Sequence, residues 1–216
     1  MSEMSEFLAI LFRGAVIGVA VAAPVGPIGL LCIRRTLAGG AVAGIASGMG
    51  AAMADAVYGV VAVAGLGVVT ALLVDHADAL KLGGGLLLLW LAAKALRPVI
   101  KPGTIPSVEG AVGAGATVLG GFAATFSLTI ANPMTIIAFA AIITGLSDEG
   151  GADGIEGAIT VAGIFLGSVA WWFFLIGLVS LIRMRLTARA FRLFDLVSGL
   201  VLAAFGLYSI ASVWRG

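Results

Sequence analysis

The sequence is short of charge. Charged residues make up 11% of its 216 residues, and hydrophobic residues make up 61%. A soluble domain carries about 25% charged and about 45–50% apolar residues, and one buried core could not absorb so large an apolar excess. The excess must therefore face lipid. This composition excludes an ordinary soluble protein and indicates an integral membrane protein.

Cysteine, histidine and net charge are also scarce, and each scarcity excludes a class of function. Cys32 is the one cysteine, so the chain can form neither an intramolecular disulfide nor a C-x-x-C redox pair, which rules out a membrane thiol–disulfide reductase. His76 is the one histidine, and it has no clustered ligands, so we predict no metal site and no cofactor. A net charge of +1 gives no reason to expect nucleic acid as a partner. We expect a protein that is not an enzyme.

Six apolar runs fill the chain. They cover residues 7–33, 41–70, 79–97, 117–145, 157–182 and 193–214. About 20 apolar residues cross the hydrocarbon layer, and a backbone in lipid must bond to itself, so each run predicts a helix. The first run is too long for a cleaved signal peptide and lacks a basic flank, so we expect it to be retained. The sequence thus predicts an all-α membrane protein with six transmembrane helices.

Charges between the runs predict how the chain crosses the membrane. The third run is the weakest, with twelve residues between Lys81 and Lys94. If it crosses, the first, third and fifth loops hold nine of the twelve Lys and Arg residues, with Arg34 and Arg35 in the first loop. Loops rich in Lys and Arg face the cytoplasm. We therefore expect a multi-pass protein of the cytoplasmic membrane with both termini outside the cytoplasm.

The six predicted spans divide into two halves. We expect a first three-helix repeat at 1–97, a cytoplasmic linker at 98–115 and a second three-helix repeat at 116–216. Three is odd, so the second half enters the membrane from the opposite side. The first helix of each half carries a proline break, at Pro24, Gly26 and Pro27 and at Asn132 and Pro133. Two inverted repeats with a discontinuous helix in each are typical of secondary transporters.

Asp55 is the most informative candidate for a functional site. It lies near the middle of the second predicted span, where a charged Asp costs about 2.5–3.5 kcal/mol, so such residues usually bind cations or relay protons. Tyr58 follows three residues later on the same helix face. It either forms a hydrogen bond with the carboxylate or the substrate or serves in packing. Asn132 offers an amide at the second break. Trp171, at mid-depth in the fifth span, either walls a cavity or faces lipid. We expect hydroxyls such as that of Thr129 to bond to the local backbone.

These residues carry a resemblance to a known family. The run Pro24-Val25-Gly26-Pro27, Arg34, the following glycines and Asp55 resemble the first half of the LysE/RhtB amino-acid exporters, and Asn132-Pro133 with Phe139 resembles their fourth helix. The resemblance covers nearly the whole chain. It implies proton-driven export of amino acids or similar small solutes from the bacterial cytoplasm. It places Pro24, Gly26, Pro27, Asp55, Asn132 and Pro133 on the family's motif positions.

One departure bears on the substrate. Lysine exporters of this family carry Gln-Asn after the Gly-Pro, whereas Ile28 and Gly29 stand here, which argues against a basic amino acid. The expected partners are a small-molecule substrate, protons and the lipid bilayer, and a homodimer is compatible with the small-residue stripes. Two alternatives stay open at this point, an exporter of divalent cations and a membrane scaffold without transport.

Overall fold

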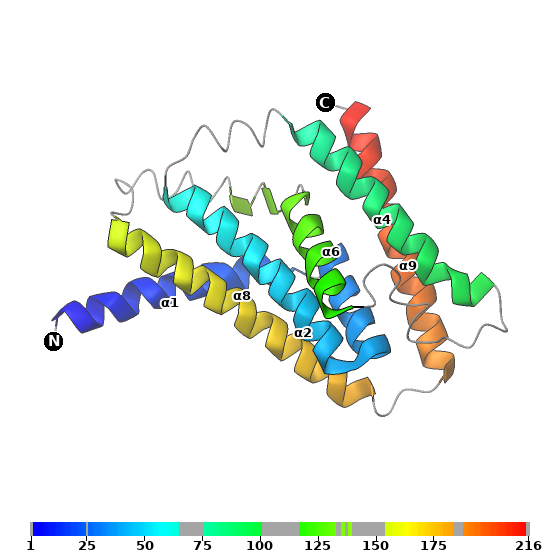
Figure 1. The fold of residues 1–216 in the computed structure, drawn as a ribbon, viewed down its shortest axis with the longest axis horizontal. Coiled ribbons are helices and arrows are strands. Elements are labelled where there is room, and N and C mark those ends of the chain that lie inside the picture. Colours follow the sequence, from blue (N-terminus) through cyan, green and yellow to red (C-terminus); the bar gives the residue numbers. More distant parts are fainter. Residues whose placement is uncertain are drawn as a thin grey trace.

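The chain is all helical in the part that the computed structural model describes, which comprises residues 2–24, 26–64, 76–100, 117–132, 135–136, 138–139, 154–183 and 188–214. Figure 1 shows the arrangement of the helices. In order they are α1 (Ser2–Ala22), α2 (Pro27–Val63), α4 (Ala77–Ile100), α6 (Val118–Ile130), α8 (Gly154–Arg183) and α9 (Ala188–Ala211), followed by the 3₁₀ turn η2 (Ser212–Trp214). Every helix except α6 is long and apolar enough to cross a membrane. The prediction of an all-α, multi-pass membrane protein is confirmed.

Helix α2 contains parts of two predicted spans. Its 37 residues would measure about 56 Å if straight, nearly twice the hydrocarbon thickness. Gly40 interrupts it with a φ of 81°, a left-handed conformation that favours glycine. Arg35 Nη1 donates to Ser47 Oγ at 3.0 Å, although a straight helix would separate these residues by about 18 Å. The chain therefore reverses at Gly40, and α2 consists of a first part, residues 27–39, and a second part, residues 41–63.

The reversal at Gly40 corrects one expectation. Arg34 and Arg35 do not lie in a loop: both belong to α2, and their residues are 3% and 4% exposed. The connection between the two spans is instead a tight turn at Gly40. Arg183 of α8 supports this turn by donating from Nη2 to the Ala38 carbonyl at 3.4 Å.

The third predicted span is a helix, and it is long and apolar enough to cross a membrane. Helix α4 runs from Ala77 to Ile100, and Lys94 places its ammonium 3.8 Å from the centre of the Trp90 ring. The fourth span begins with α6, which ends at Ile130. Most of its remaining part, including Pro133, lies outside the described residues, as does most of the linker at 98–115.

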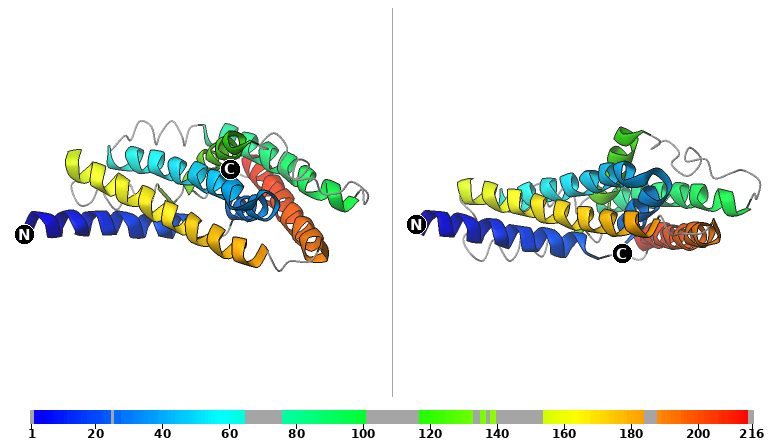
Figure 2. Two further views of the ribbon diagram at one scale, coloured as in Figure 1. Left: turned by 60° about the horizontal axis from the view of Figure 1, so that its bottom comes forward. Right: turned by 90° about the horizontal axis from the view of Figure 1, so that it is seen from below.

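The helices pack in four main pairs, which Figures 1 and 2 show from three directions. Helices α1 and α8 run parallel and touch through glycines, since a Cβ on Gly14 would meet the backbone of Gly163 and one on Gly167 would meet the Ala15 carbonyl. Helix α8 also packs antiparallel to the second part of α2, and α6 packs parallel to that part. Helices α4 and α9 pack antiparallel to each other on the right of Figure 1. Glycines thus bring the backbones together, as is common between membrane helices.

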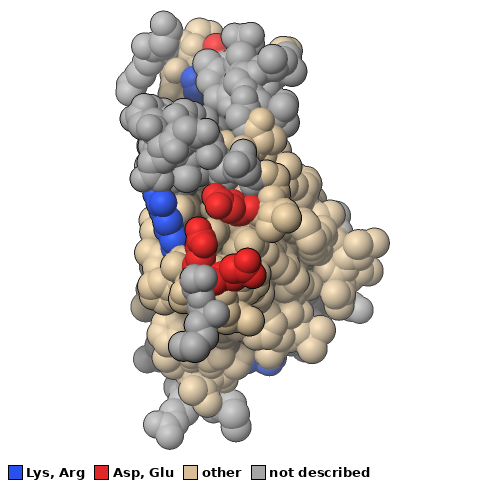
Figure 3. Space-filling model, turned by 90° about the vertical axis from the view of Figure 1, so that its left-hand side faces the viewer, with Lys and Arg blue, Asp and Glu red and all other residues tan. Residues whose placement is uncertain are grey.

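Acidic side chains gather at one end of the molecule. Figure 3 shows them on the face that carries the beginnings of α1 and α8. Helix α1 has Glu3 in its first turn and α8 has Glu156, and both residues are exposed. Arg34, Arg35, Lys94 and Arg183 lie instead near the Gly40 turn or at the ends of α4 and α8. The two ends of the helices therefore differ in charge.

Candidate functional site

A cavity of about 560 Å³ lies where the first span is broken. Its walls come from the end of α1, the start of α2, the middle of α2, α6 and the residues after it, α8 and α9. The lining residues are Ile17, Ala20, Val21, Ala22, Pro24, Gly26, Pro27, Ile28, Ala51, Asp55, Thr129, Asn132, Thr135, Ala138, Trp172 and Phe205. Asp55 is the one charged side chain among these described residues, and most of the others are apolar.

The first proline break is a complete helix end rather than a kink. The last helical hydrogen bond joins Ala23 N to Val19 O at 2.8 Å, and α2 begins at Pro27. Pro27 occupies the first turn, where its missing N–H costs no hydrogen bond. Gly26 is the N-cap and no side chain caps the helix there. The last carbonyls of α1 and the first N–H groups of α2, which lack helical partners, therefore lie at the cavity wall.

Asp55 reaches the cavity from the second part of α2 and is 3% exposed. Ser168 of α8 donates its hydroxyl hydrogen to Asp55 Oδ2 at 2.7 Å. Trp172 Nε1 in turn donates to Ser168 Oγ at 3.2 Å. The three side chains form a chain of hydrogen bonds that fixes one carboxylate oxygen. Because Asp55 is also a cavity residue, the carboxyl group is available to a solute or proton there.

The second break also faces the cavity. Helix α6 ends at Ile130, and Asn132 follows outside the helix with its Nδ2 3.0 Å from Thr135 Oγ1. Tyr58 donates its hydroxyl to the Ile130 carbonyl at 2.6 Å, and its ring stacks on Phe139 with centroids 5.2 Å apart. Tyr58 therefore ties the second part of α2 to the end of α6.

The structure brings together five of the eight residues that the sequence singled out. Pro24, Gly26, Pro27, Asp55 and Asn132 line the same cavity.

Of the other three candidates, two take a different place and one is not described. Tyr58 braces the second break from α2. Trp171 is not among the lining residues, and its ring lies against Phe174 at 5.8 Å, whereas the neighbouring Trp172 lines the cavity. Pro133 lies outside the described residues.

Ser168 and Thr135 were not predicted from the sequence, whereas Trp172, next to Trp171 at mid-depth in the fifth span, was considered as a possible cavity wall and does line the cavity. A lone serine in an apolar helix carries no pattern that marks it as a carboxylate partner. Thr129 bonds back to the Thr125 carbonyl at 2.9 Å, as expected of a hydroxyl near a break, yet it also lines the cavity.

No group of three or more His, Cys, Asp or Glu residues could hold a metal ion within the described part of the chain. An all-helical, multi-pass membrane protein with a mostly apolar cavity, one buried acid and broken helices around it has the construction of a translocator of small molecules. Residues 19–212 match the family model of the LysE type translocator, so the chain belongs to that family of membrane exporters. No curated protein and no solved structure matches it significantly.

Proposed function

We propose that this protein exports neutral amino acids, or solutes of the same zwitterionic chemistry, from the cytoplasm in exchange for protons. The observation that carries the proposal is the cavity in which Asp55 faces the first helix break. A buried acid in a membrane protein usually relays protons or binds cationic groups. Asp55 would bind the substrate ammonium in one state and a proton in the other, so that the two cargoes compete for one group.

The ends of the broken helix supply complementary partial charges. The last carbonyls of α1, next to Ala20 and Ala22, suit an ammonium group. The first N–H groups of α2 without a helical acceptor, those of Ile28 and Gly29, suit a carboxylate because a helix N-terminus carries partial positive charge. A small zwitterion matches both ends. Since Ile28 and most other lining side chains are apolar, a neutral substrate suits the walls better than a basic or acidic one.

The helix pairs support two inverted repeats. In such an arrangement the first, second and third spans correspond to the fourth, fifth and sixth. The contact between the first and fifth spans should therefore resemble the contact between the fourth and second. Helix α1 does pack parallel to α8, and α6 packs parallel to the second part of α2. The two-fold axis of the repeat would interchange α8 with the second part of α2, and α4 with α9. Helices interchanged by an axis in the membrane plane run in opposite directions, and both pairs are antiparallel.

One glycine contact in each half supports the same correspondence. A Cβ on Gly167 of α8 would meet the Ala15 carbonyl, nine residues before Pro24. A Cβ on Gly50 of α2 would meet the Phe122 carbonyl, ten residues before Asn132. In each half a glycine of the second span would lie against the first span of the other half, nine or ten residues before the break. A two-fold arrangement of this kind would allow the cavity to open to either side of the membrane in turn.

Charge asymmetry supports the proposed orientation in the cytoplasmic membrane. The basic end of the helices, near the Gly40 turn, would face the cytoplasm, together with the linker at 98–115. The acidic end in Figure 3, which carries Glu3 and Glu156, would face the outside.

Flux in proteoliposomes tests the proposed function. The purified protein is reconstituted with an imposed pH gradient, and uptake of labelled neutral, basic and acidic amino acids and of Mn²⁺ is compared. We expect gradient-driven flux of neutral amino acids, its loss in Asp55→Asn, and wild-type rates in the matched control Asp78→Asn, whose carboxylate is exposed at the start of α4. Flux of Mn²⁺ alone, or unchanged amino-acid flux in Asp55→Asn, would overturn the proposal.

A further inference from the structure

The helices form two sets that meet along a narrow seam. Helices α1, α2, α6 and α8 pack on one another, and α4 packs mainly on α9, with glycines such as Gly85 and Gly206 pressed together. Helix α9 is the main contact between the α4–α9 pair and the other set, and it meets α2. In Figure 1 the α4–α9 pair stands at the right, beside the lower part of α2. This seam is the natural place for relative movement of the two sets.

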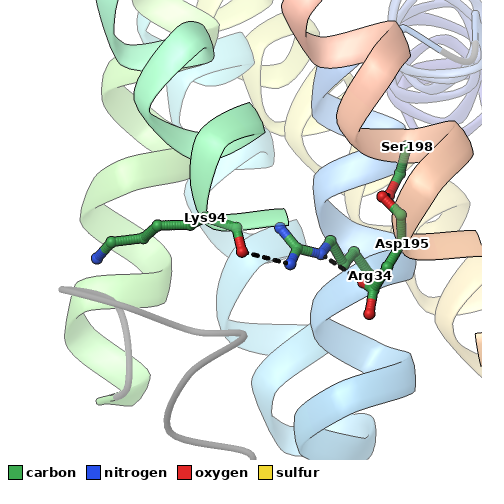
Figure 4. A network of polar contacts seen from close by, with 4 residues as sticks. All are labelled: Arg34, Lys94, Asp195 and Ser198. Atoms are coloured by element: carbon green, nitrogen blue, oxygen red, sulfur yellow. Dashed lines mark hydrogen bonds and ion pairs between the residues drawn. The ribbon is translucent and has the colours of Figure 1, made fainter. Parts of the chain in front are cut away.

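Arg34 of α2 crosses the seam to both helices of the pair, as Figure 4 shows. Its Nε donates to Asp195 Oδ1 of α9 at 3.0 Å, and its Nη2 lies 3.5 Å from the backbone carbonyl of Lys94 in α4. The Arg34 side chain is 4% exposed and that of Asp195 is 17% exposed. The contact is therefore a largely buried ion pair that joins α2 to α9 and reaches α4.

The neighbouring arginine serves as a contrast. Arg35 donates from Nη1 to the Gly121 carbonyl at 2.7 Å and to Thr125 Oγ1 at 2.8 Å, in addition to Ser47. All of these partners belong to α2 or α6, so Arg35 bonds within one set while Arg34 bonds between the sets. Arg35 thus stabilises the set that contains α2 and α6, whereas Arg34 joins this set to the α4–α9 pair.

An apolar layer lies between the cavity and the ion pair. Along α2, Ile28 lines the cavity and Arg34 follows six residues later, about 9 Å along the helix. Between them Leu31 and Cys32 are buried in one cluster with residues of α4 and α9, including Leu202. Helices α6 and α8 also contribute to this cluster, but α2, α4 and α9, which form the ion pair, all take part in it. Separation of α4 and α9 from α2 would open the apolar layer and the ion pair together.

We propose that the Arg34–Asp195 ion pair is a lock that keeps the basic end of the translocator closed, and that the α4–α9 pair moves away from α2 when it opens. A buried ion pair suits a lock because its attraction is nearly balanced by the cost of removing both charges from water. Water that enters on opening solvates both groups again. The pair can therefore fix the closed geometry without making it much more stable than the open one.

The native Cys32 reports on this lock because it is the chain's one cysteine, is fully buried and stands two residues before Arg34. The test measures its labelling by a membrane-impermeant maleimide in inside-out and right-side-out vesicles. The variants are Arg34→Gln, Asp195→Asn and the exchange of both charges. The matched control is Asp78→Asn, which breaks an exposed pair with Lys81 of similar length, 2.9 Å.

We expect slow labelling in the wild type and in the control. Each single variant should label faster by a factor of about 10 to 100, a usual range for a coupling between two states. The increase should appear with reagent at the cytoplasmic face, where the basic end is placed, and the charge-exchanged variant should return towards the wild-type rate. If the single variants fail to assemble, the charge-exchanged variant tests the proposal by itself. Slow labelling of Cys32 in that variant would support the lock, and rapid labelling would contradict it.

Wild-type labelling in both single variants would also overturn the proposal, as would equal acceleration in Asp78→Asn or acceleration from the outer face alone. No substrate enters the measurement. Its outcome is therefore separate from that of the flux experiment, and either proposal can fail without the other.

Discussion

Replacement of Tyr58 by Phe isolates one hydrogen bond at the second helix break. Helix α6 ends at Ile130, so this carbonyl is one of the last four that lack a helical donor. The Tyr58 hydroxyl donates to it at 2.6 Å, and Tyr58 is 3% exposed. Phe keeps the ring and its stacking on Phe139, and it removes the donor alone.

The expected cost follows from what is left behind. A buried acceptor without a partner costs about 1–3 kcal/mol, and because the bond to Ile130 is only partly buried the lower part of that range is expected. For a chain of this length, 1 kcal/mol corresponds to about 2–4 °C in Tm, so Tyr58→Phe should lower the Tm by an amount in the lower part of a range of about 2–12 °C. The assay is thermal unfolding of the purified protein in detergent, followed by circular dichroism.

The chain offers a matched control for this change. Its other tyrosine, Tyr208 of α9, is 65% exposed, so Tyr208→Phe should leave the Tm within about 1 °C of the wild type, as surface substitutions usually do. Equal Tm values for Tyr58→Phe and Tyr208→Phe would show that the Tyr58 hydroxyl does not stabilise the end of α6.

Two further substitutions test the packing and the cavity, each with a control on the same helix, α8. Gly167→Val should separate α1 from α8 and cost about 1–3 kcal/mol in the same unfolding assay, while Gly177→Val, which has open space around it, should cost less than about 0.5 kcal/mol. Ser168→Ala removes the donor to Asp55 and should slow flux about tenfold, the equivalent of one charge-assisted hydrogen bond. Ser180→Ala should leave flux unchanged, because the Ser180 hydroxyl is buried without a partner in the described residues; equal flux in the two serine variants would contradict the role of Ser168.

The helical fold could largely be predicted from the sequence because lipid imposes simple rules. Apolar runs marked the helices, including the weak third one, which is α4 in the structure. Asp55 could be singled out because a charge in the hydrocarbon is costly wherever it stands. The prolines marked the first break, although Pro27 proved to begin a helix rather than to distort one.

Other features depend on partners that are distant in the sequence and could not be predicted. Arg34 was predicted to lie in a loop because its partner, Asp195, is 161 residues away in the sequence. Gly40 is one of 32 glycines in the sequence, and no local pattern marks it as the residue at which the chain reverses. Ser168 is a candidate site residue because it donates to Asp55, which is 113 residues away in the sequence. In each case a tertiary contact, and not a local pattern, decides the role of the residue.

The central claim is that Asp55 carries the proton that drives export. The most direct measurement compares two modes of transport by Asp55→Asn in the same proteoliposomes, net flux driven by a pH gradient and exchange of labelled for unlabelled substrate without a gradient. An amide keeps the shape of the side chain but cannot carry the proton. We expect that the pH gradient no longer drives net flux in the variant, while exchange continues at a measurable rate. Net flux that still follows the pH gradient in Asp55→Asn would contradict it.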